Sequence, residues 1–330
     1  MTVTAPSPGP DVAGAGEPTP LLQLRGLVKR FEQSTAVAGL DLDVRAGEVF
    51  GLLGPNGAGK TTTIRVICGE LAADAGTVHL HGRALGTSAR DRARVGLCPQ
   101  EIVVWHQLTC VEQLELVGRL HRVPARQARR RGRRLLDDLG LADQADTLAG
   151  RMSGGMQRRL NIALSLVHAP ELVILDEPGA GLDPASRVLV REFVRGLAHD
   201  TAVLVTTHEM DEAERICDRV AIIDHGRLLA CDSPDALLRG LGLGELVELR
   251  LPGPATAELG AAVADAAGVP GGAVAADRVT LTLRCERAAT VLPAVLTRLA
   301  GHGVTPDEVR LRQACLEDVF LDLTGRSVRP

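Results

Sequence analysis

The spacing of hydrophobic residues changes several times along this chain, and each change predicts a different kind of element. Near the amino terminus, short apolar or alternating runs separated by glycine-containing turns predict strands, as in "LLQLRGLVKRF" and "GLDLDVRAGEVFGLLG". A glycine-rich turn and the start of a helix follow at once in "GPNGAGKTTTIRVICGEL". The segment before them, residues 1–20, is rich in proline and glycine and lacks the apolar core of a secretory signal, so we expect a disordered leader.

The middle of the chain first has helical spacing and then returns to strands. Apolar residues recur at i, i+3 and i+4 in "CVEQLELVGRLHRV" and in "PARQARRRGRRLLDDLGL", which predicts a helical insert over residues 88–167. Three compact apolar runs follow, "ELVILDEP", "TAVLVTTHEM" and "RVAIIDHG", as in buried parallel strands. Strands that alternate with helices predict a mainly parallel α/β sheet, here interrupted by the insert.

The last part of the chain repeats this alternation on a smaller scale. After a short helix and a glycine-rich turn, "ELVELRL", an alanine-rich helix, "RVTLTLR", "TVLPAVLTRLA", "DEVRLRQ" and "CLEDVFLDL" follow in order. We therefore expect residues 241–330 to form a small α+β domain behind a larger domain at residues 21–240.

Composition narrows the classes of function. Of 330 residues, 45% are hydrophobic and 24% are charged, and no apolar run reaches the roughly 20 residues of a membrane span, so we expect a protein that is soluble by itself. A net charge of -4 and the scarcity of aromatic residues argue against nucleic acid as a partner. The seven cysteines include no C-x-x-C pair, which is typical of reduced thiols in a cytoplasmic protein.

The stretch "RQARRRGRR" is strongly basic, although the chain as a whole has a net charge of only -4. It has two interpretations, a surface for nucleic acid or anionic lipid and a solvated helix face. We favour the solvated face because Asp137, Asp138 and Asp143 follow soon after it.

The loop "GPNGAGKT" matches the phosphate-binding pattern G-x-x-x-x-G-K-[ST]. Its glycines let backbone amides surround phosphate oxygens, Lys60 supplies a point charge, and the Thr61 hydroxyl is a ligand for Mg²⁺. A plain turn before a helix is the alternative, but the strand–loop–helix context favours a nucleotide site. The predicted nucleotide-binding residues of this loop are Gly54, Asn56, Gly57, Gly59, Lys60, Thr61 and Thr62.

Polar residues at the ends of three strands complete this site. Asp176 and Glu177 end "LVILDE", where we expect Asp176 to hold Mg²⁺ and Glu177 to polarise the attacking water. His208 ends the next strand and is placed to contact the γ-phosphate. Gln100, after "VGLCP", is a neutral group that could orient the metal or the water. Each residue has a structural alternative when taken alone: a turn cap for the acids, a structural or surface position for His208, and an ordinary strand end for Gln100. The phosphate loop makes the catalytic interpretation the stronger one.

A second glycine-rich helix start lies in "RMSGGMQRRL". Ser153, Gly154 and Gly155 precede an apolar-periodic run, so bare amides and a serine hydroxyl would face something negative. A simple helix cap would require the serine but not two glycines after it.

The motifs "GPNGAGKT", "CPQ", "MSGGM", "LVILDEP", "GLDP" and "TTH", in this order, resemble the ATP-binding subunit of ABC (ATP-binding cassette) transporters over about residues 21–238. The resemblance implies a P-loop cassette: a mainly parallel sheet with antiparallel β and helical subdomains, followed by the small α+β domain. It implies ATP and Mg²⁺ as cofactors. It also implies that two cassettes pair head to tail, so that Ser153, Gly154 and Gly155 close over the partner's ATP. A complete set of motifs favours a homodimer.

Two further positions carry over by motif. The resemblance implies that Asp183, in "GLDP", communicates across the dimer. It implies that Phe31, in "KRF", stacks on adenine where tyrosine is the familiar occupant.

The tail "CLEDVFLDLTGR", with "SGGMQRRL", resembles the exporter branch called drug-resistance or ABC-2 ATPases. This branch implies a peripheral subunit at the cytoplasmic face of the membrane, driving efflux of a drug, antibiotic or lipid-like cargo through a separate permease. Contact with the permease is expected near residues 100–108, where Trp105 has two open interpretations, docking residue and core of the insert. The rivals are an importer subunit and a non-transport ATPase acting on ribosomes or nucleic acid, although translation factors of this superfamily normally carry a second cassette.

Overall fold

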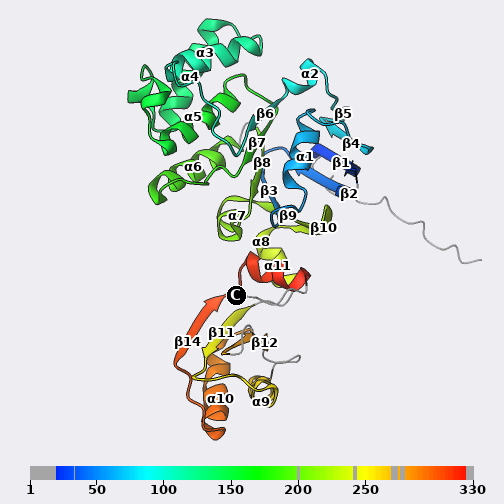
Figure 1. Ribbon diagram of the computed structural model, residues 1–330, viewed down its shortest axis with the longest axis vertical. Helices are drawn as coiled ribbons and strands as arrows, with labels where there is room; N and C mark the ends of the chain where they lie inside the picture. Colours follow the sequence, from blue (N-terminus) through cyan, green and yellow to red (C-terminus); the bar gives the residue numbers. More distant parts are fainter. Residues whose placement is uncertain are drawn as a thin grey trace, which may run out of the picture.

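The computed structural model describes residues 20–32, 34–198, 201–240, 244–268, 274–275 and 279–324, and three sheets lie within them (Figure 1). Except for Pro20, which begins the first strand, the predicted leader lies outside the described residues. Among the described helices, none combines the length and the apolarity needed to cross a bilayer.

The first sheet is antiparallel and has the strand order β2-β1-β4-β5. Its strands are β1 (Pro20–Phe31), β2 (Ser34–Arg45), β4 (Ala75–Leu80) and β5 (Arg83–Ala84). Leu22 and Leu24 of β1 alternate with polar residues and are fully buried, as expected for a sheet with one face on the core. Its strand β2 lies beside the end of the phosphate loop, which follows β3, since a Cβ added at Gly59 would lie 2.3 Å from the carbonyl oxygen of Ala36.

The central sheet has six strands in the order β10-β9-β3-β8-β7-β6, all parallel except β10. They are β3 (Val49–Leu53), β6 (Val95–Cys98), β7 (Leu172–Asp176), β8 (Ala202–Thr207), β9 (Arg219–Asp224) and β10 (Arg227–Asp232). Every residue of β3, β7 and β8 is buried, because both faces are covered.

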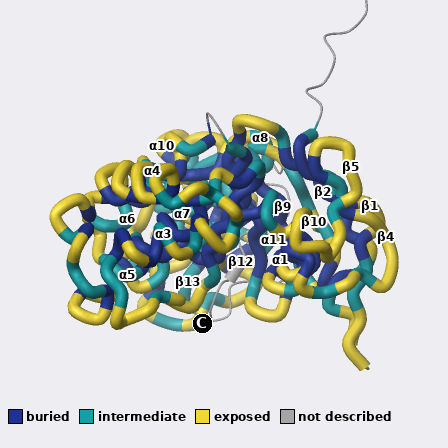
Figure 2. The backbone as a smooth tube through the Cα atoms, turned by 90° about the horizontal axis from the view of Figure 1, so that it is seen from above, coloured by how far each residue is buried: buried dark blue, intermediate teal, exposed yellow. Residues whose placement is uncertain are grey.

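Two hydrophobic cores flank this sheet. Phe50, Leu52 and Ile174 face the antiparallel sheet and α1 (Lys60–Ile67), whereas the alternate residues Val173 and Val203 face helices on the other side. Those helices are α5 (Gly154–Leu166), α6 (Pro184–Leu197) and α7 (Met210–Ile216). Figure 2 shows the buried strands inside the exposed outer turns of the helices.

The helical part consists of α3 (Cys110–Leu120), α4 (Ala125–Asp138) and α5, with the short segments η1 (Ala142–Gln144) and η2 (Ala149–Arg151); α2 (Ala89–Arg92) precedes it. Strand β6 falls inside the range predicted for the helical insert but pairs with β7 in the central sheet. On α4, Arg129 and Arg133 are exposed and form ion pairs with Glu115 and Asp146, so the basic stretch is a solvated helix face.

The third sheet has the order β12-β13-β11-β14 and is antiparallel. Its elements are β11 (Glu245–Arg250), α9 (Ala257–Ala267), β12 (Val274–Ala275), β13 (Thr280–Cys285), α10 (Ala288–Gly301) and β14 (Glu308–Gln313). This is a β-α-β-β-α-β unit in which Val247 and Leu281 pack against Val263 and Leu299 of the helices. The predicted fold class, a P-loop cassette with a small α+β region, is confirmed.

The chain then returns to the cassette through α11 (Leu316–Thr324), which packs on α7 and on α8 (Pro234–Gly240). Leu316 and Val319 are buried in the same core as α5 to α7, and the Leu316 amide donates to Glu214 of α7 at 3.2 Å.

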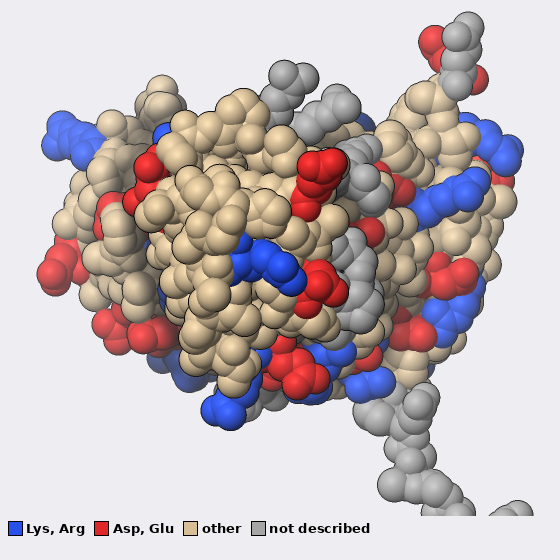
Figure 3. Space-filling view, turned by 90° about the horizontal axis from the view of Figure 1, so that it is seen from below, with Lys and Arg blue, Asp and Glu red and all other residues tan. Residues whose placement is uncertain are grey.

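Acidic and basic side chains are interspersed over the face seen in Figure 3 and do not gather by sign.

Candidate functional site

The predicted site residues come from loops that leave one edge of the central sheet. Strands β3, β6, β7 and β8 are parallel, so their carboxyl ends meet at the same edge. Ligands of open α/β sheets bind outside this edge. The phosphate loop, Gln100, Glu177 and His208 each follow one of these strands by a few residues.

The phosphate loop is held tightly by its own chain. Gly59 precedes α1 with a φ of 105°, and a Cβ at this position would lie 2.3 Å from the carbonyl oxygen of Ala36, so only glycine fits. Lys60 is buried, and its Nζ donates to the carbonyls of Gly54 at 2.6 Å and Pro55 at 3.2 Å. The loop is therefore closed on itself in a shape that leaves amides free for phosphate.

Burial also acts on the charge of Lys60. Desolvation lowers the pKa of its ammonium, and the carboxylates of Glu177 and Asp176 raise that pKa and oppose the shift. A phosphate beside Lys60 would add negative charge and favour the ammonium form further. The other predicted loop residues differ in exposure: Asn56, Gly57 and Thr61 are exposed, and Thr62 is half-buried.

Asp176 ends β7 and Glu177 follows it directly, and each has a defined partner. The Thr206 hydroxyl of β8 donates to Oδ1 of the buried Asp176. Glu177 is also buried and has a φ of 51°, an uncommon value for a residue other than glycine. The turn directs its carboxylate toward two neighbours at the sheet edge.

Those neighbours are Gln100 and His208, so the structure brings together the three residues predicted to be catalytic. Gln100 Nε2 donates to Glu177 Oε2 at 2.9 Å, and His208 Nδ1 lies 2.6 Å from Glu177 Oε1. Because a carboxylate accepts hydrogen bonds, Nδ1 is the donor and Nε2 of His208 remains available. A water between Glu177 and a bound phosphate would replace the hydrogen bond of Glu177 with either Gln100 or His208.

The residues predicted to hold Mg²⁺ offer the ligands that this ion prefers. Asp176 keeps Oδ2 outside its bond with Thr206, and Gln100 keeps its amide oxygen outside its bond with Glu177. Together with the exposed Thr61 hydroxyl, these are hard oxygen ligands. The donor set fits Mg²⁺ carried by a nucleotide.

The second glycine-rich helix start is open. Ser153 caps α5, and its hydroxyl accepts from the Met156 amide at 3.3 Å. A Cβ added to Gly154 would meet nothing within 4 Å. Helix α5 packs in the core on one side of the central sheet and α1 in the core on the other (Figure 1), so the structure does not bring this helix start to the phosphate loop of the same chain.

Asp183 lies beside the second glycine-rich helix start. Asp183 caps α6, where the hydroxyl and amide of Ser186 lower the pKa of its carboxyl group. A Cβ at Gly155 would lie 4.0 Å from Asp183 Oδ2.

Phe31 is 42% exposed at the turn from β1 to β2, with Lys29 Nζ 5.7 Å from its ring centre. Its ring is thus open to a planar ligand.

A hollow beside the helical part involves Trp105. Val103 and Trp105 line it, together with Pro99, His121 and His168. The Trp105 side chain is 41% exposed while its backbone is held by two hydrogen bonds to the Gln113 side chain. This exposure favours the docking interpretation of Trp105 over the core interpretation.

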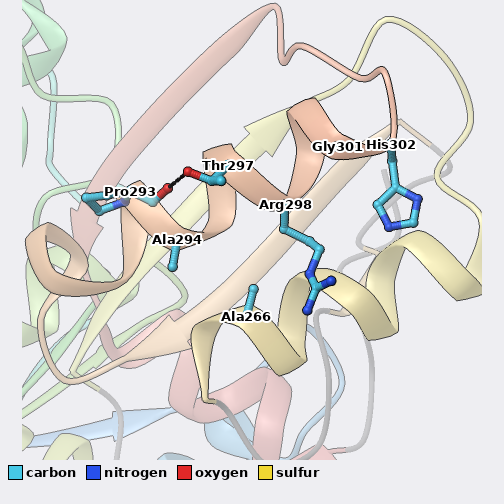
Figure 4. A pocket seen from close by; sticks show the side chains of 7 residues that line it. All are labelled: Ala266, Pro293, Ala294, Thr297, Arg298, Gly301 and His302. Atoms are coloured by element: carbon cyan, nitrogen blue, oxygen red, sulfur yellow. Dashed lines mark hydrogen bonds between the residues drawn. The ribbon is translucent and has the colours of Figure 1, made fainter.

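Another hollow lies in the carboxyl-terminal unit, between α9 and α10 (Figure 4). It is lined by Ala266, Pro293, Ala294, Thr297, Arg298, Gly301 and His302. In Figure 4 the Arg298 side chain reaches across toward α9, where it pairs with Asp265 at 3.5 Å. Its guanidinium is thus paired within the carboxyl-terminal unit.

Two residues of this site, Thr206 and Arg158, were not predicted from the sequence. Arg158 of α5 is buried and donates to backbone carbonyls around Gln100 and Glu177. A signal was present: Arg158 lies three and four positions before Asn161 and Ile162, on the buried face of its helix.

Comparison with known proteins agrees with this geometry. The family model described as "ABC transporter" matches residues 37–180. The Nod factor export ATP-binding protein I of Ralstonia nicotianae is 39% identical over 98% of this chain and 98% of its own length. The daunorubicin resistance ATP-binding protein DrrA2 of Streptomyces coeruleorubidus is 40% identical over 92% of this chain and 95% of its own.

A solved structure described as "Structure of ATP binding subunit of ABC transporter" is 28% identical, with a TM-score of 0.62 over 67% of this chain and 93% of its own. The predicted resemblance to the exporter and drug-resistance branch is confirmed by the curated relatives. The chain therefore belongs to the ABC transporter family, as an ATP-binding subunit.

Proposed function

We propose that this chain hydrolyses ATP as one of two identical cassettes paired head to tail, and that the resulting motion drives export through a separate membrane protein. One observation carries the pairing. The Ser153–Gly154 helix start is open to solvent and stands apart from the phosphate loop of its own chain. A second copy that places its nucleotide against this helix start would complete the site, because amides at a helix start bind phosphate.

Within each site, the residues have separate roles. The amides of the phosphate loop and Lys60 hold the phosphates, and Phe31 stacks on the adenine ring. Glu177 accepts a proton from the attacking water, while His208 and Gln100 fix its carboxylate and contact the γ-phosphate and the water. Mg²⁺, held by Thr61, Asp176 and Gln100, would neutralise phosphate charge.

Asp183 and Ser153 make the junction between the two copies. Both lie at exposed helix starts, and Asp183 is adjacent to Gly155. We propose that the Ser153 hydroxyl contacts the partner's γ-phosphate and that Asp183 contacts the partner's own loop residues. Closure of the pair would then require ATP in both sites.

The membrane partner would dock in the hollow that Val103 and Trp105 line, at the cytoplasmic face of the membrane. We propose that residues 21–240 form the cassette and residues 241–330 an accessory domain whose last helix, α11, packs back on the cassette. The names of the two relatives refer to a Nod factor and to daunorubicin, which are chemically different molecules. The cargo is accordingly set by the membrane protein and not by this subunit.

The function is tested with the tagged Glu177→Gln variant, which should bind ATP without hydrolysing it. The variant is purified with Mg-ATP from detergent-solubilised native membranes, and copurifying proteins are identified by mass spectrometry. We expect a polytopic membrane protein in stoichiometric amount, and we expect that protein in vesicles to stimulate the ATPase activity of the parent chain but not of Glu177→Gln. Ribosomal proteins or nucleic-acid enzymes instead would contradict the transport function.

A further inference from the structure

Arg158 is a buried cation whose hydrogen bonds all go to backbone. Its side chain is 2% exposed, and in the described part of the chain its guanidinium donates to five carbonyl oxygens and to no carboxylate. Burying a charge is costly unless its donors are satisfied, so this arrangement persists only because the carbonyls are fixed around it.

The five carbonyls belong to the two segments that carry the candidate catalytic residues. Nη1 donates at 2.7 Å to both Pro99 and Gln100, which follow β6. Nη2 donates to Asp176 at 2.7 Å and to Glu177, and Nε donates to Pro178 at 3.4 Å. The planar fork thus joins the ends of two neighbouring strands, a geometry that the point charge of a lysine cannot reproduce.

One of these carbonyls belongs to a strained residue. Glu177 has a φ of 51° and precedes Pro178, although a residue before proline favours an extended conformation. Such strain persists only where surrounding contacts hold it. The Glu177 amide donates to Thr206 at 3.0 Å, and its carbonyl accepts from the Ala180 amide at 3.1 Å and from Arg158. Arg158 is therefore part of what holds the Glu177 carboxylate in place.

Arg158 also belongs to the helix that Ser153 caps. It lies five positions after Ser153 and just over one turn into α5. A continuous helix therefore connects the Ser153–Gly154 amides with the backbone of Gln100 and Glu177.

We infer that Arg158 is a positioning residue that couples the two nucleotide sites of a cassette pair. Contact of Ser153 with the partner's phosphate moves α5, and Arg158 transmits this shift to Glu177 and Gln100 in the chain's own site. The inference rests on the proposed head-to-tail pair. It predicts that loss of the guanidinium impairs turnover while leaving ATP binding at the phosphate loop intact.

The test compares Arg158→Met and Arg158→Lys with the control Arg159→Met. Arg159 is the next residue of α5 and also donates to carbonyls, but to those of Leu139 and Gly140, after α4. We expect kcat to fall on the order of 100-fold in Arg158→Met, since a displacement of about 1 Å costs this much. The Kd of a fluorescent ATP analogue should stay within about threefold of the parent. Arg158→Lys should be intermediate, and Arg159→Met should keep kcat within about threefold.

A second readout is ATP-dependent dimerisation in the Glu177→Gln background, which Arg158→Met should weaken and Arg159→Met should not. Turnover of Arg158→Met near the parent rate, or equal losses in kcat and ATP affinity, would overturn the inference. If Arg158→Met does not fold, Arg158→Lys decides, with lowered kcat and unchanged Kd in support and parent-like kcat against. A parent chain without ATPase activity even with its membrane partner would instead refute the proposed function, on which this inference rests.

Discussion

The described helices α1 and α5 both have glycines at their start, and they differ in what their own chain places against those glycines. Both α1 and α5 direct unpaired amides and a positive dipole end outward. At α1, the backbone of Ala36 lies against Gly59, and Lys60 is buried among loop carbonyls. At α5, among the described residues, no atom outside the helix's own backbone and the neighbouring residues lies within 4 Å of the position of a Cβ on Gly154.

The difference shows which glycine the fold itself requires. Gly59 has a left-handed φ and no room for a side chain, so the chain needs glycine there whether or not a ligand binds. Gly154 lies in a helical turn with open space beside it, and the fold of the single chain does not explain its presence. In the proposed pair, the absence of a side chain at Gly154 leaves room for the partner's nucleotide.

Removing the charge of Lys60 from the phosphate loop should have the largest effect on ATP turnover. We expect Lys60→Ala to lower ATP turnover at least about 1,000-fold, equivalent to about 4 kcal/mol of lost transition-state stabilisation. The fold should persist, because Lys60 is a desolvated cation whose pKa is lowered by burial. Phosphate release and thermal unfolding measure the two quantities, and turnover within tenfold of the parent would refute the assignment.

Adding a methyl group to Gly59, at the start of α1, tests whether the surrounding backbone leaves room for a side chain there. In Gly59→Ala the new Cβ would meet the Ala36 carbonyl at 2.3 Å with a φ of 105°, so we expect unfolding free energy to fall by about 2–4 kcal/mol. Gly57→Ala is the matched control, since Gly57 has a φ of 82° but nothing within 4 Å, and should cost about 1 kcal/mol. Urea unfolding without nucleotide measures both, and equal losses would contradict the clash.

The same methyl group at the open helix start should affect turnover and not stability. Gly154→Ala faces empty space inside a helix, so stability should be unchanged or rise by up to about 1 kcal/mol. Turnover should fall at least about tenfold, because the methyl group would stand between Ser153 and the partner's phosphate. ATP-dependent dimerisation in the Glu177→Gln background should weaken in parallel. Parent-like turnover would show that nothing docks at this helix start.

Local patterns in the sequence predicted those features that depend on neighbouring residues. The apolar runs before Asp176 and His208 predict buried strands, and parallel strands bring their carboxyl ends to one edge. The contact of Glu177 with both Gln100 and His208 follows from this edge, although the distances could not be predicted.

The features that the sequence did not reveal depend on residues far apart in the chain. The carbonyls that hold Arg158 lie up to 59 positions away from it, so no local spacing identifies them. The apolar face of α11 was visible as a pattern, but a pattern does not say what covers a face. In the structure, Leu316 and Val319 pack into the cassette, against α7 and α8, and not into the core of the third sheet.

The smallest effect should come from Ser153, whose hydroxyl has one contact within its own chain and one proposed contact with the partner's phosphate. Inside the chain the hydroxyl accepts the Met156 amide as a helix cap, so Ser153→Ala should lower stability by about 1 kcal/mol. Toward the partner it is the proposed phosphate contact, so turnover should also fall a few fold, by about the strength of one hydrogen bond. Ser153→Thr keeps the hydroxyl and should spare both quantities. Loss of stability without loss of turnover in Ser153→Ala would mean that this serine is a cap alone, and that the amides of Gly154 and Gly155 bind the partner's phosphate without it.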